Sequence, residues 1–368
     1  MKNIYLISIL AILTITCSSA QHRQKITSQD YLSLKWKQVS TKMPAEWYGT
    51  EDAKLVAENV LLSQKEIGGW EKNKPYHHKF SESEKAHYIQ DKSEIGATFD
   101  NGATISELRF LAKVYSHFHD ERYKQAFEKG LDYIFISQYE NGGWPQFYPY
   151  KSDYADHITY NDDAMVNTMK FLFQILDDSK EFSSLQINKN RKDKAQKAFD
   201  KGIQCILKTQ IVVNGQPTVW CAQHDEKTFA PANARAYELA SFSGGESVNI
   251  ALLLMKIDKP SKEIIAAVNG AVKWFEANKI EGVKLTQETD KNGKNNRIIV
   301  KDKNASPLWA RFYDLETGKP YFCSRDGIKR NSLAEISYER RNGYGWYTNA
   351  PAKLLKEYPD WRKKVNAK

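Results

Sequence analysis

One short signature, which occurs three times, constrains what this chain can fold into. It reads SQ-x3-GGW at residues 63–70 and again at residues 137–144, and a looser copy lies between Gln210 and Trp220. The three tryptophans are 74 and 76 residues apart. A period of this regularity indicates a fold that is built from repeated structural units.

Apolar residues between these signatures follow helical spacing and come in pairs of segments. Their recurrence at i, i+3 and i+4 predicts helices over residues 105–115, 123–135, 164–176, 195–207, 248–255 and 264–275. A polar turn joins the two helices of each pair, and the glycine-rich signature ends the second. A helical hairpin cannot bury its apolar faces alone, so neighbouring units must stack. We therefore predict an all-α fold, an (α/α)3 toroid of repeated hairpins, in preference to an open solenoid.

The sequence predicts few strands, and these lie on loops. Val212–Val213 before an Asn-Gly turn, and residues 283–285 facing residues 298–300, are expected to form short β-hairpins. The repeated tryptophans have two interpretations, a buried plug over the helix ends or a stacking surface for a sugar ring. The sequence leaves both interpretations open.

The first twenty residues have the layout of an export signal. A single lysine precedes an apolar run from Ile4 to Ile15, which is too short to span a membrane, and small residues end at Ala20. We expect residues 1–20 to be a signal peptide, residues 21–44 an N-terminal segment and residues 45–368 the toroid domain of a periplasmic or secreted protein. The alternative is lipidation at Cys17, which would anchor the mature chain.

The charge of the chain favours an anionic partner. Lysine and arginine number 54 against 45 aspartate and glutamate, a formal net charge of +9. Because no basic run typical of nucleic-acid binders is present, an acidic polysaccharide fits better than nucleic acid. Cys205, Cys221 and Cys323 have no metal-site spacing, and a bond between Cys205 and Cys221 stays open. We expect a monomer without a membrane span.

Three polar loops precede the first helices of successive hairpins, and the repeat brings them to one end of the ring. They comprise residues 98–102 (TFDNG), residues 159–163 (TYNDD) and residues 233–246. Each loop has an ordinary interpretation as a helix N-cap. Ser243, with Glu246 three residues later, is typical of a capping box.

Two of these loops carry more oxygen atoms than a cap requires. Asp100 and Asn101 lie in the first, and Asp162 and Asp163 lie in the second. Carboxylates gathered at one end of a ring repel one another unless a cation lies among them. Oxygen ligands of this kind suit calcium, which takes six or more of them.

Two arginines lie in loops rich in small residues, at Arg235 and Arg325. Their ordinary interpretation is a surface ion pair. The guanidinium fork also matches a carboxylate, so both side chains are candidates for contact with an acidic sugar. Calcium, arginine and an acidic polysaccharide form a chemically coherent set.

Six segments resemble those of the pectate lyases of polysaccharide lyase family 10. They are TFDNGAT, GGWPQFYP, ITYNDDAM, ARAYELASFSGGESV, PLWARFYDLETGKPYFCSRDG and ERRNGYGWY, which follow one another in order within residues 45–360. The resemblance implies an (α/α)3 toroid, calcium dependence and cleavage of polygalacturonate, the de-esterified form of pectin, by anti β-elimination. It makes residues 45–368 a pectate lyase catalytic domain.

The resemblance also implies a calcium–substrate site. Asp100, Asn101 and Asp162 occupy matching positions in it. Asp163 adjoins a matched position and is placed with the metal ligands Asp100 and Asp162, whereas Asn101 is placed with the substrate-binding residues.

Three arginines complete the implied site. Arg235 would be the base that removes the C5 proton, and Arg325 would bind a substrate carboxylate. Arg311, in the PLWARF segment, is placed with the substrate-binding residues without a defined task. Arginine has a pKa above about 12 and normally stays protonated. The base role therefore requires neighbours that lower the pKa of Arg235.

Two other functions fit the same residues. An inverting glycoside hydrolase on an α/α toroid would use Asp100 with Asp162 or Asp163 as its acid and base. A non-catalytic protein would bind pectin without cleaving it. Only a lyase produces 4,5-unsaturated oligogalacturonides, so the absorbance of that product distinguishes the three functions.

Overall fold

The computed structural model describes residues 28–289 and 293–367, so the expected signal peptide and Cys17 lie outside the described residues. Three helical hairpins form its centre, as predicted: α4 (Ile105–Phe118) with α5 (Glu121–Ile136), α6 (Ala164–Leu176) with α7 (Lys189–Thr209), and α8 (Glu246–Leu254) with α9 (Lys262–Ala277). Within the described ranges, no helix is both long and apolar enough to cross a membrane.

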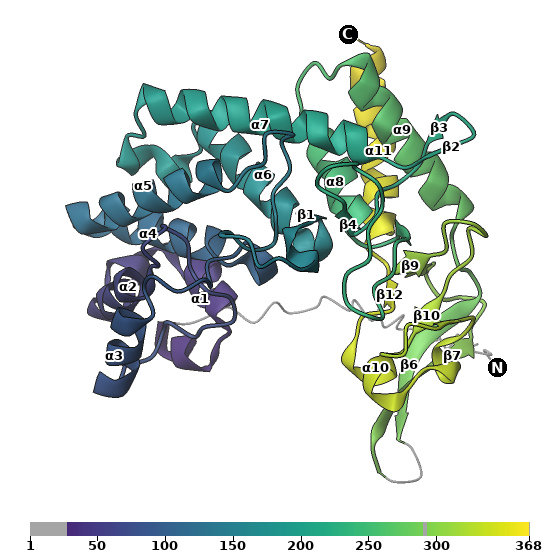
Figure 1. Cartoon of the computed structure of the whole chain (residues 1–368), viewed down its shortest axis with the longest axis horizontal. Coiled ribbons are helices and arrows are strands. Elements are labelled where there is room, and N and C mark those ends of the chain that lie inside the picture. Colours follow the sequence, from purple (N-terminus) through teal and green to yellow (C-terminus); the bar gives the residue numbers. More distant parts are fainter. Residues whose placement is uncertain (1–27, 290–292, 368) are drawn as a thin grey trace, which may run out of the picture.

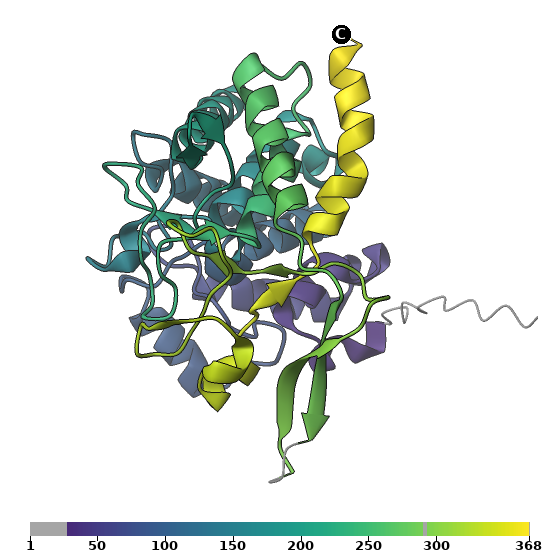
Figure 2. The ribbon, with the colours of Figure 1, turned by 90° about the vertical axis from the view of Figure 1, so that its right-hand side faces the viewer.

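The hairpins follow one another around an (α/α) toroid, which confirms the predicted fold class (Figure 1). The inner helices α4, α6 and α8 contact in sequence order, and so do the outer helices α5, α7 and α9. At one end, α1 (Trp36–Lys42) and α2 (Glu51–Ser63) pack on α4. At the other end, α11 (Pro351–Asn366) packs on α8 and α9 (Figure 2). Two short helices, α3 (Glu82–Gln90) and α10 (Tyr338–Gly343), lie outside these layers.

The signature tryptophans are buried plugs, not sugar platforms. The indole N–H of Trp70 donates to the Val60 carbonyl at 2.8 Å, which ties the ring to the helix that it follows. The equivalent bonds recur at Trp144, Trp220 and Trp309. All four rings are at most 1% exposed. The bond at Trp309 reveals a fourth repeat that the sequence pattern did not indicate.

The signature glutamine joins each unit to the next. The Gln64 amide donates to the carbonyl of Gly68 at 2.7 Å and to that of Ala126, in the following hairpin, at 2.9 Å. Gln138 and Gln210 form the same two kinds of bond. Such a bond closes the glycine turn and orients the neighbouring outer helix. The repeated sequence therefore encodes the stacking of the units.

Strands in the described residues are short and form six two-stranded sheets. The two predicted hairpins are confirmed, as β2 (Val212–Val213) with β3 (Gln216–Pro217) and β6 (Val283–Thr289) with β7 (Asn295–Lys301). The other pairs join distant segments: β1 (Ile158–Thr159) with β4 (Gln223–His224), β5 (Phe242–Ser243) with β9 (Phe312–Tyr313), β8 (Trp309–Ala310) with β12 (Tyr347–Thr348), and β10 (Phe322–Cys323) with β11 (Lys329–Arg330).

A second, smaller hydrophobic cluster supports the loops after α7 and α9. It includes Tyr237, Phe312, Tyr321, Tyr344 and Trp346. Several of its aromatic rings stack or meet edge to face. This cluster is separate from the core of the helical hairpins. The three cysteines of the described chain are buried and free, so Cys205 and Cys221 do not pair.

Candidate active site

Two short 3-10 turns place the predicted acidic residues, and they share one local structure. Asp100–Gly102 and Asn161–Asp163 precede α4 and α6, respectively. The second residue of each turn is left-handed, with φ of 54° at Asn101 and 52° at Asp162. Aspartate and asparagine tolerate this conformation better than most residues. The two turns contact each other, so the repeat brings Asp100 close to Asp162.

The first turn is held by residues that follow the first signature tryptophan. Asp100 is buried, accepts a hydrogen bond from its neighbour's backbone N–H at 2.9 Å, and forms an ion pair with Lys72. The side chain of Asn101 is exposed and donates to Asn73 Oδ1 at 3.1 Å. The backbone N–H of Trp70 donates to Thr104 Oγ1, which anchors the start of α4.

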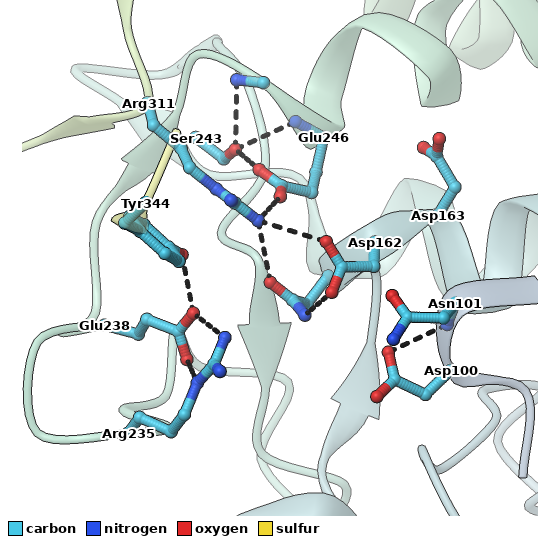
Figure 3. A network of polar contacts seen from close by, with 12 residues as sticks. Asp100, Asn101, Asp162, Asp163, Arg235, Glu238, Ser243, Glu246, Arg311 and Tyr344 are labelled. Atoms are coloured by element: carbon cyan, nitrogen blue, oxygen red, sulfur yellow. Dashed lines mark hydrogen bonds and ion pairs between the residues drawn. The ribbon is translucent and has the colours of Figure 1, made fainter. Parts of the chain in front are cut away.

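Asp162 lies in an excess of negative charge. Its carboxylate accepts from Asn161 Nδ2 at 3.0 Å and lies 3.5 Å from the Arg311 guanidinium (Figure 3). Burial raises the pKa of Asp162; Arg311 opposes this rise, whereas Glu246 and Asp100 add to it. The neighbouring carboxylates therefore disfavour the ionised form that a metal ligand needs, and a bound cation would relieve the repulsion.

Asp163 does not join the other two carboxylates. Both of its oxygens accept from Asn249 Nδ2, at 3.0 and 2.9 Å, and its side chain points away from Asp100 (Figure 3). The backbone is left-handed at Asp162 and again at Asp163, which turns the two successive side chains apart. The carboxylate oxygens of Asp100, Asp162 and Asp163 therefore do not all lie within 4.8 Å of one another.

Asp100, Asn101 and Asp162 fit a calcium ion as an incomplete set of ligands. They offer side-chain oxygens from two turns in contact, and the repulsion at Asp162 matches the place where a cation would be favourable. Asp163 was also predicted as a metal ligand, but its carboxylate accepts from Asn249 and points away from Asp100 (Figure 3). The remaining ligands would have to come from water or from the carboxylates of a bound substrate.

Arg235 forms a bidentate pair with a buried carboxylate. Its Nε and Nη2 donate to the two oxygens of Glu238 at 2.7 and 2.5 Å, and Glu238 also accepts from the Tyr344 hydroxyl at 2.5 Å. The hydrogen bonds that Arg235 donates to Glu238 raise the pKa of Arg235 above its usual range. This is opposite to the shift that the base role was expected to require. The reason is the partner Glu238, whose stabilisation of the guanidinium exceeds the effect of burial.

Arg311 holds three loops together. One of its nitrogens donates to Asn161 Oδ1 at 2.9 Å and to Glu246 Oε1 at 2.5 Å, beside the contact with Asp162. The ring of Tyr344 lies 4.7 Å from the guanidinium carbon. Ser243 Oγ donates to the Glu246 carboxylate and accepts from the Glu246 backbone N–H at 3.0 Å. The predicted capping box is nevertheless not formed, because Gly245 is the N-cap of α8 and the backbone N–H of Ser243 donates to the Trp220 carbonyl.

Arg325 lies on the exposed side of the same group of arginines. Its side chain is 66% exposed and pairs with Glu339 at 3.1 Å. The ring of Tyr237 lies 5.7 Å from its guanidinium carbon and 5.1 Å from that of Arg235. Arg340 packs on this ring as well, at 4.5 Å. The aromatic cluster thus brings Arg235 and Arg325 together, although they are far apart in the sequence.

The structure adds residues that the sequence did not single out. Glu238 is the partner of Arg235, Tyr344 contacts Glu238 and Arg311, and Lys72 is the partner of Asp100. Arg340 shares the Tyr237 ring and the Glu339 carboxylate with Arg325. Glu238 and Tyr344 occur in the segments ARAYELASF and ERRNGYGWY, so the motif contained them without indicating a task. The spacing of Arg235 and Glu238 by three residues was the available signal.

A small cavity opens among these side chains, and we call it the rim cavity. It has a volume of about 230 Å³ and is lined by Asp162, Asp163, Glu246, Asn249 and Arg311, among others. Three of these five residues are acidic. Asp162 is the one residue that this cavity shares with the calcium set, because Asp100 and Asn101 do not line it.

Comparisons with known proteins agree with this geometry. A family profile described as pectic acid lyase matches residues 64–355. A family 10 polysaccharide lyase from Cellvibrio cellulosa is 35% identical, with a TM-score of 0.75 over 89% of this chain and 95% of that chain. A mutant of a family 10 lyase from the same organism, in complex with trigalacturonic acid, is 34% identical, with a TM-score of 0.75 over 92% of this chain and 99% of that one. No curated protein matched the chain.

Proposed function

This chain belongs to the pectic acid lyase family, and we propose on that premise that it cleaves polygalacturonate by calcium-dependent anti β-elimination. It is a pectate lyase of polysaccharide lyase family 10, which replaces the hydrolase and non-catalytic alternatives. One observation carries the proposal. Two contacting turns with Asp100, Asn101 and Asp162 lie beside a group of arginines that is ordered by tyrosine rings.

Substrate binding would use the exposed arginine. Arg325 pairs with Glu339, and both side chains are more than half exposed. An exposed ion pair is weak, so a substrate carboxylate can replace Glu339 at little cost. Tyr237 packs on the guanidinium and limits its orientations. Arg325 would thus present a bidentate fork to a uronate.

The acidic turns would hold the cation. Asp100, Asn101 and Asp162 are the residues that we assign to calcium, and Lys72 and Asn161 orient the two carboxylates. When bound, calcium withdraws charge from the substrate carboxylate and makes the C5 proton more acidic. Arg311 contacts Asp162 and so keeps a positive charge at the same place.

Proton transfer would use Arg235 and Glu238 together. Because Glu238 keeps Arg235 protonated, a free neutral arginine is an unfavourable base. The C5–H bond breaks and its proton goes to a guanidinium nitrogen, while another guanidinium proton moves to a Glu238 oxygen along an existing hydrogen bond. The electron pair that remains at C5 forms the C4–C5 double bond. The bond from C4 to the leaving oxygen breaks, and we assign the proton of that oxygen to water.

Export of the chain is a separate proposal. It rests on the apolar run and small residues at the start of the sequence. Removal of residues 1–20 would leave a soluble periplasmic or secreted enzyme, and lipidation at Cys17 would leave an anchored one. Mass measurement of the mature N-terminus distinguishes these two outcomes from an unprocessed chain.

The decisive experiment is an assay on polygalacturonate with calcium and with excess EDTA. We expect ultraviolet absorbance from unsaturated product in calcium and its loss in EDTA, with recovery when calcium is restored. Release of reducing ends without that absorbance would show hydrolysis instead. Full activity in EDTA would contradict the assignment of Asp100, Asn101 and Asp162 to the cation.

A further inference from the structure

A second and larger cavity lies behind the two acidic turns. It has a volume of about 710 Å³, within the range of ligand sites, and lies between α1, α4, α6 and the segment Lys180–Leu185. Gly102, which ends the first acidic turn, lines this cavity. The cavity therefore adjoins the proposed catalytic site without including Asp100, Asp162 or Arg235. We call it the basic cavity.

The basic cavity is rich in positive charge. Its lining has one carboxylate, that of Glu181, and six cationic side chains: Lys37, Arg109, Lys113, Lys170, Lys180 and Lys256. They come from α1, α4, α6, the segment after α6 and the residue pair that follows α8. Packing of the inner helices thus collects charges from five places in the sequence.

Glu181 is already committed within this set. It forms ion pairs with Arg109 and, at 3.8 Å, with Lys113. Arg109 also donates to Gln174 and packs on Phe171 and Phe182, so it acts as a fixed part of the wall. Burial lowers the pKa of Lys113, Glu181 opposes this shift, and the guanidinium of Arg109 adds to it.

Three of the lysines have no anionic partner. Among the described residues, no carboxylate oxygen lies within 4.0 Å of the ammonium groups of Lys37, Lys180 or Lys256. Lys170 donates to the neutral side chain of Asn249. Lys37, Lys180 and Lys256 are all exposed residues. The cavity therefore presents accessible ammonium groups that have no anionic partner among the described residues.

We propose that the basic cavity binds a second stretch of polyuronate, separate from the segment that is cleaved. The choice of a uronate rests on the proposed function, because that function supplies an anionic polymer beside the cavity. Ammonium groups and hydroxyls are suitable partners for the carboxylates and hydroxyls of an acidic sugar. Lys37 approaches Gly102 at the shared wall, so a chain held here lies next to the catalytic turns.

The experiment measures equilibrium binding of an oligogalacturonate by calorimetry in excess EDTA and low salt. Under the proposed function, the catalytic site loses its cation in EDTA and keeps only its arginines, so substitutions of the cavity lysines isolate the contribution of the basic cavity. We expect saturable binding that weakens as salt is added. The triple variant Lys37→Gln, Lys180→Gln and Lys256→Gln should weaken it about tenfold, as expected when three partly exposed ion pairs are lost.

A matched control removes the same charge elsewhere. Lys194, Lys197 and Lys273 are exposed on the outer helices α7 and α9, and their joint change to glutamine should leave binding in EDTA within about twofold of the wild type. Equal affinities of the two triple variants, or no binding in EDTA, would overturn the proposal. Tighter binding of a single-stranded nucleic acid than of the oligogalacturonate would overturn the assigned occupant.

The assays distinguish a failure of the lyase assignment from a failure of the basic cavity as a uronate site. If the wild type forms no unsaturated product in calcium, the lyase assignment fails whatever the binding in EDTA shows. If product forms and the two triple variants bind alike in EDTA, the lyase assignment stands and the basic cavity is not a uronate site.

Discussion

The rim cavity and the basic cavity differ in whether their cationic side chains have carboxylate partners. In the rim cavity the one cationic side chain of the lining, Arg311, pairs with Glu246 and Asp162. In the basic cavity Lys37, Lys180 and Lys256 lack such partners within the described residues. The two linings share no residue, but Lys170 of the basic cavity donates to Asn249 of the rim cavity at 3.2 Å.

We therefore expect the rim cavity to orient the substrate and the basic cavity to attract it. Paired and buried charges have fixed positions, which a reaction at a defined atom needs. Unpaired lysines on flexible stems attract an anionic chain without fixing its atoms, and salt weakens that attraction. Substitutions at the rim should therefore change turnover, and substitutions in the basic cavity should change affinity.

The largest effect is expected at Arg235. Replacement by lysine or alanine removes the group that receives the C5 proton, so kcat should fall by about 100-fold or more. Steady-state kinetics on polygalacturonate checks this result, with binding of an oligogalacturonate in calcium as the control for folding. A lysine variant with kcat within about tenfold of the wild type and a raised KM would reduce Arg235 to a binding residue.

The adjacent aspartates should differ strongly. Asp162→Ala removes an assigned calcium ligand, and activity should fall by about 100-fold with a raised calcium requirement. Asp163→Ala removes the bonds to Asn249 and one carboxylate of the rim cavity but no assigned calcium ligand, so activity should stay within about tenfold of the wild type. Calcium titration of both variants, with circular dichroism as the folding control, tests the pair. Similar losses in both variants would return Asp163 to the metal site.

Glu238→Gln distinguishes two versions of the proton transfer. Glutamine cannot accept a proton, so a relay through Glu238 predicts a fall in kcat of about tenfold or more. Glu238 raises the pKa of Arg235, so its loss should lower that pKa and extend activity to lower pH if Arg235 acts alone. The pH profile of kcat decides between them. A gain of activity below the wild-type optimum would remove Glu238 from the relay.

The smallest effect concerns Glu107, in the inner helix α4 beside the basic cavity. Burial raises its pKa to about 7, against the usual value of about 4.3 in an unfolded chain. The folded state therefore binds more protons in this interval, and the free energy of unfolding falls as pH rises from about 4.3 to 7. Glu107→Gln should remove this fall and stabilise the protein at pH 8 by on the order of 1–3 kcal/mol.

Denaturant unfolding at pH 5 and pH 8 measures that difference. The glutamine oxygen can still accept the bond from Trp36 Nε1, so the variant and the wild type should have similar stability at pH 5. Equal stability of the wild type at pH 5 and pH 8 would contradict this prediction, because it would show that Glu107 is ionised in the folded protein at both pH values.

Much of the scaffold was predictable because it depends on local patterns. The six predicted helices follow from apolar spacing, and the period of the tryptophans indicated the stacked units. The fourth repeat at Trp309 escaped because the seven residues immediately before it, 302–308 (DKNASPL), contain no glutamine and no glycine. The identities of Asp100, Asp162, Arg235 and Arg325 came from motifs, whereas their partners did not.

The sequence by itself determined which units repeat and which residue types stand at the ends of the helices, since helix periodicity and turn preferences act between near neighbours. Only the tertiary structure decided that Asp163 turns away from Asp162, that Glu238 raises the pKa of Arg235, and that unpaired lysines line one cavity. These properties depend on distances through space and on burial. Packing sets both, and it joins side chains such as Lys37 and Lys256 that no local pattern relates.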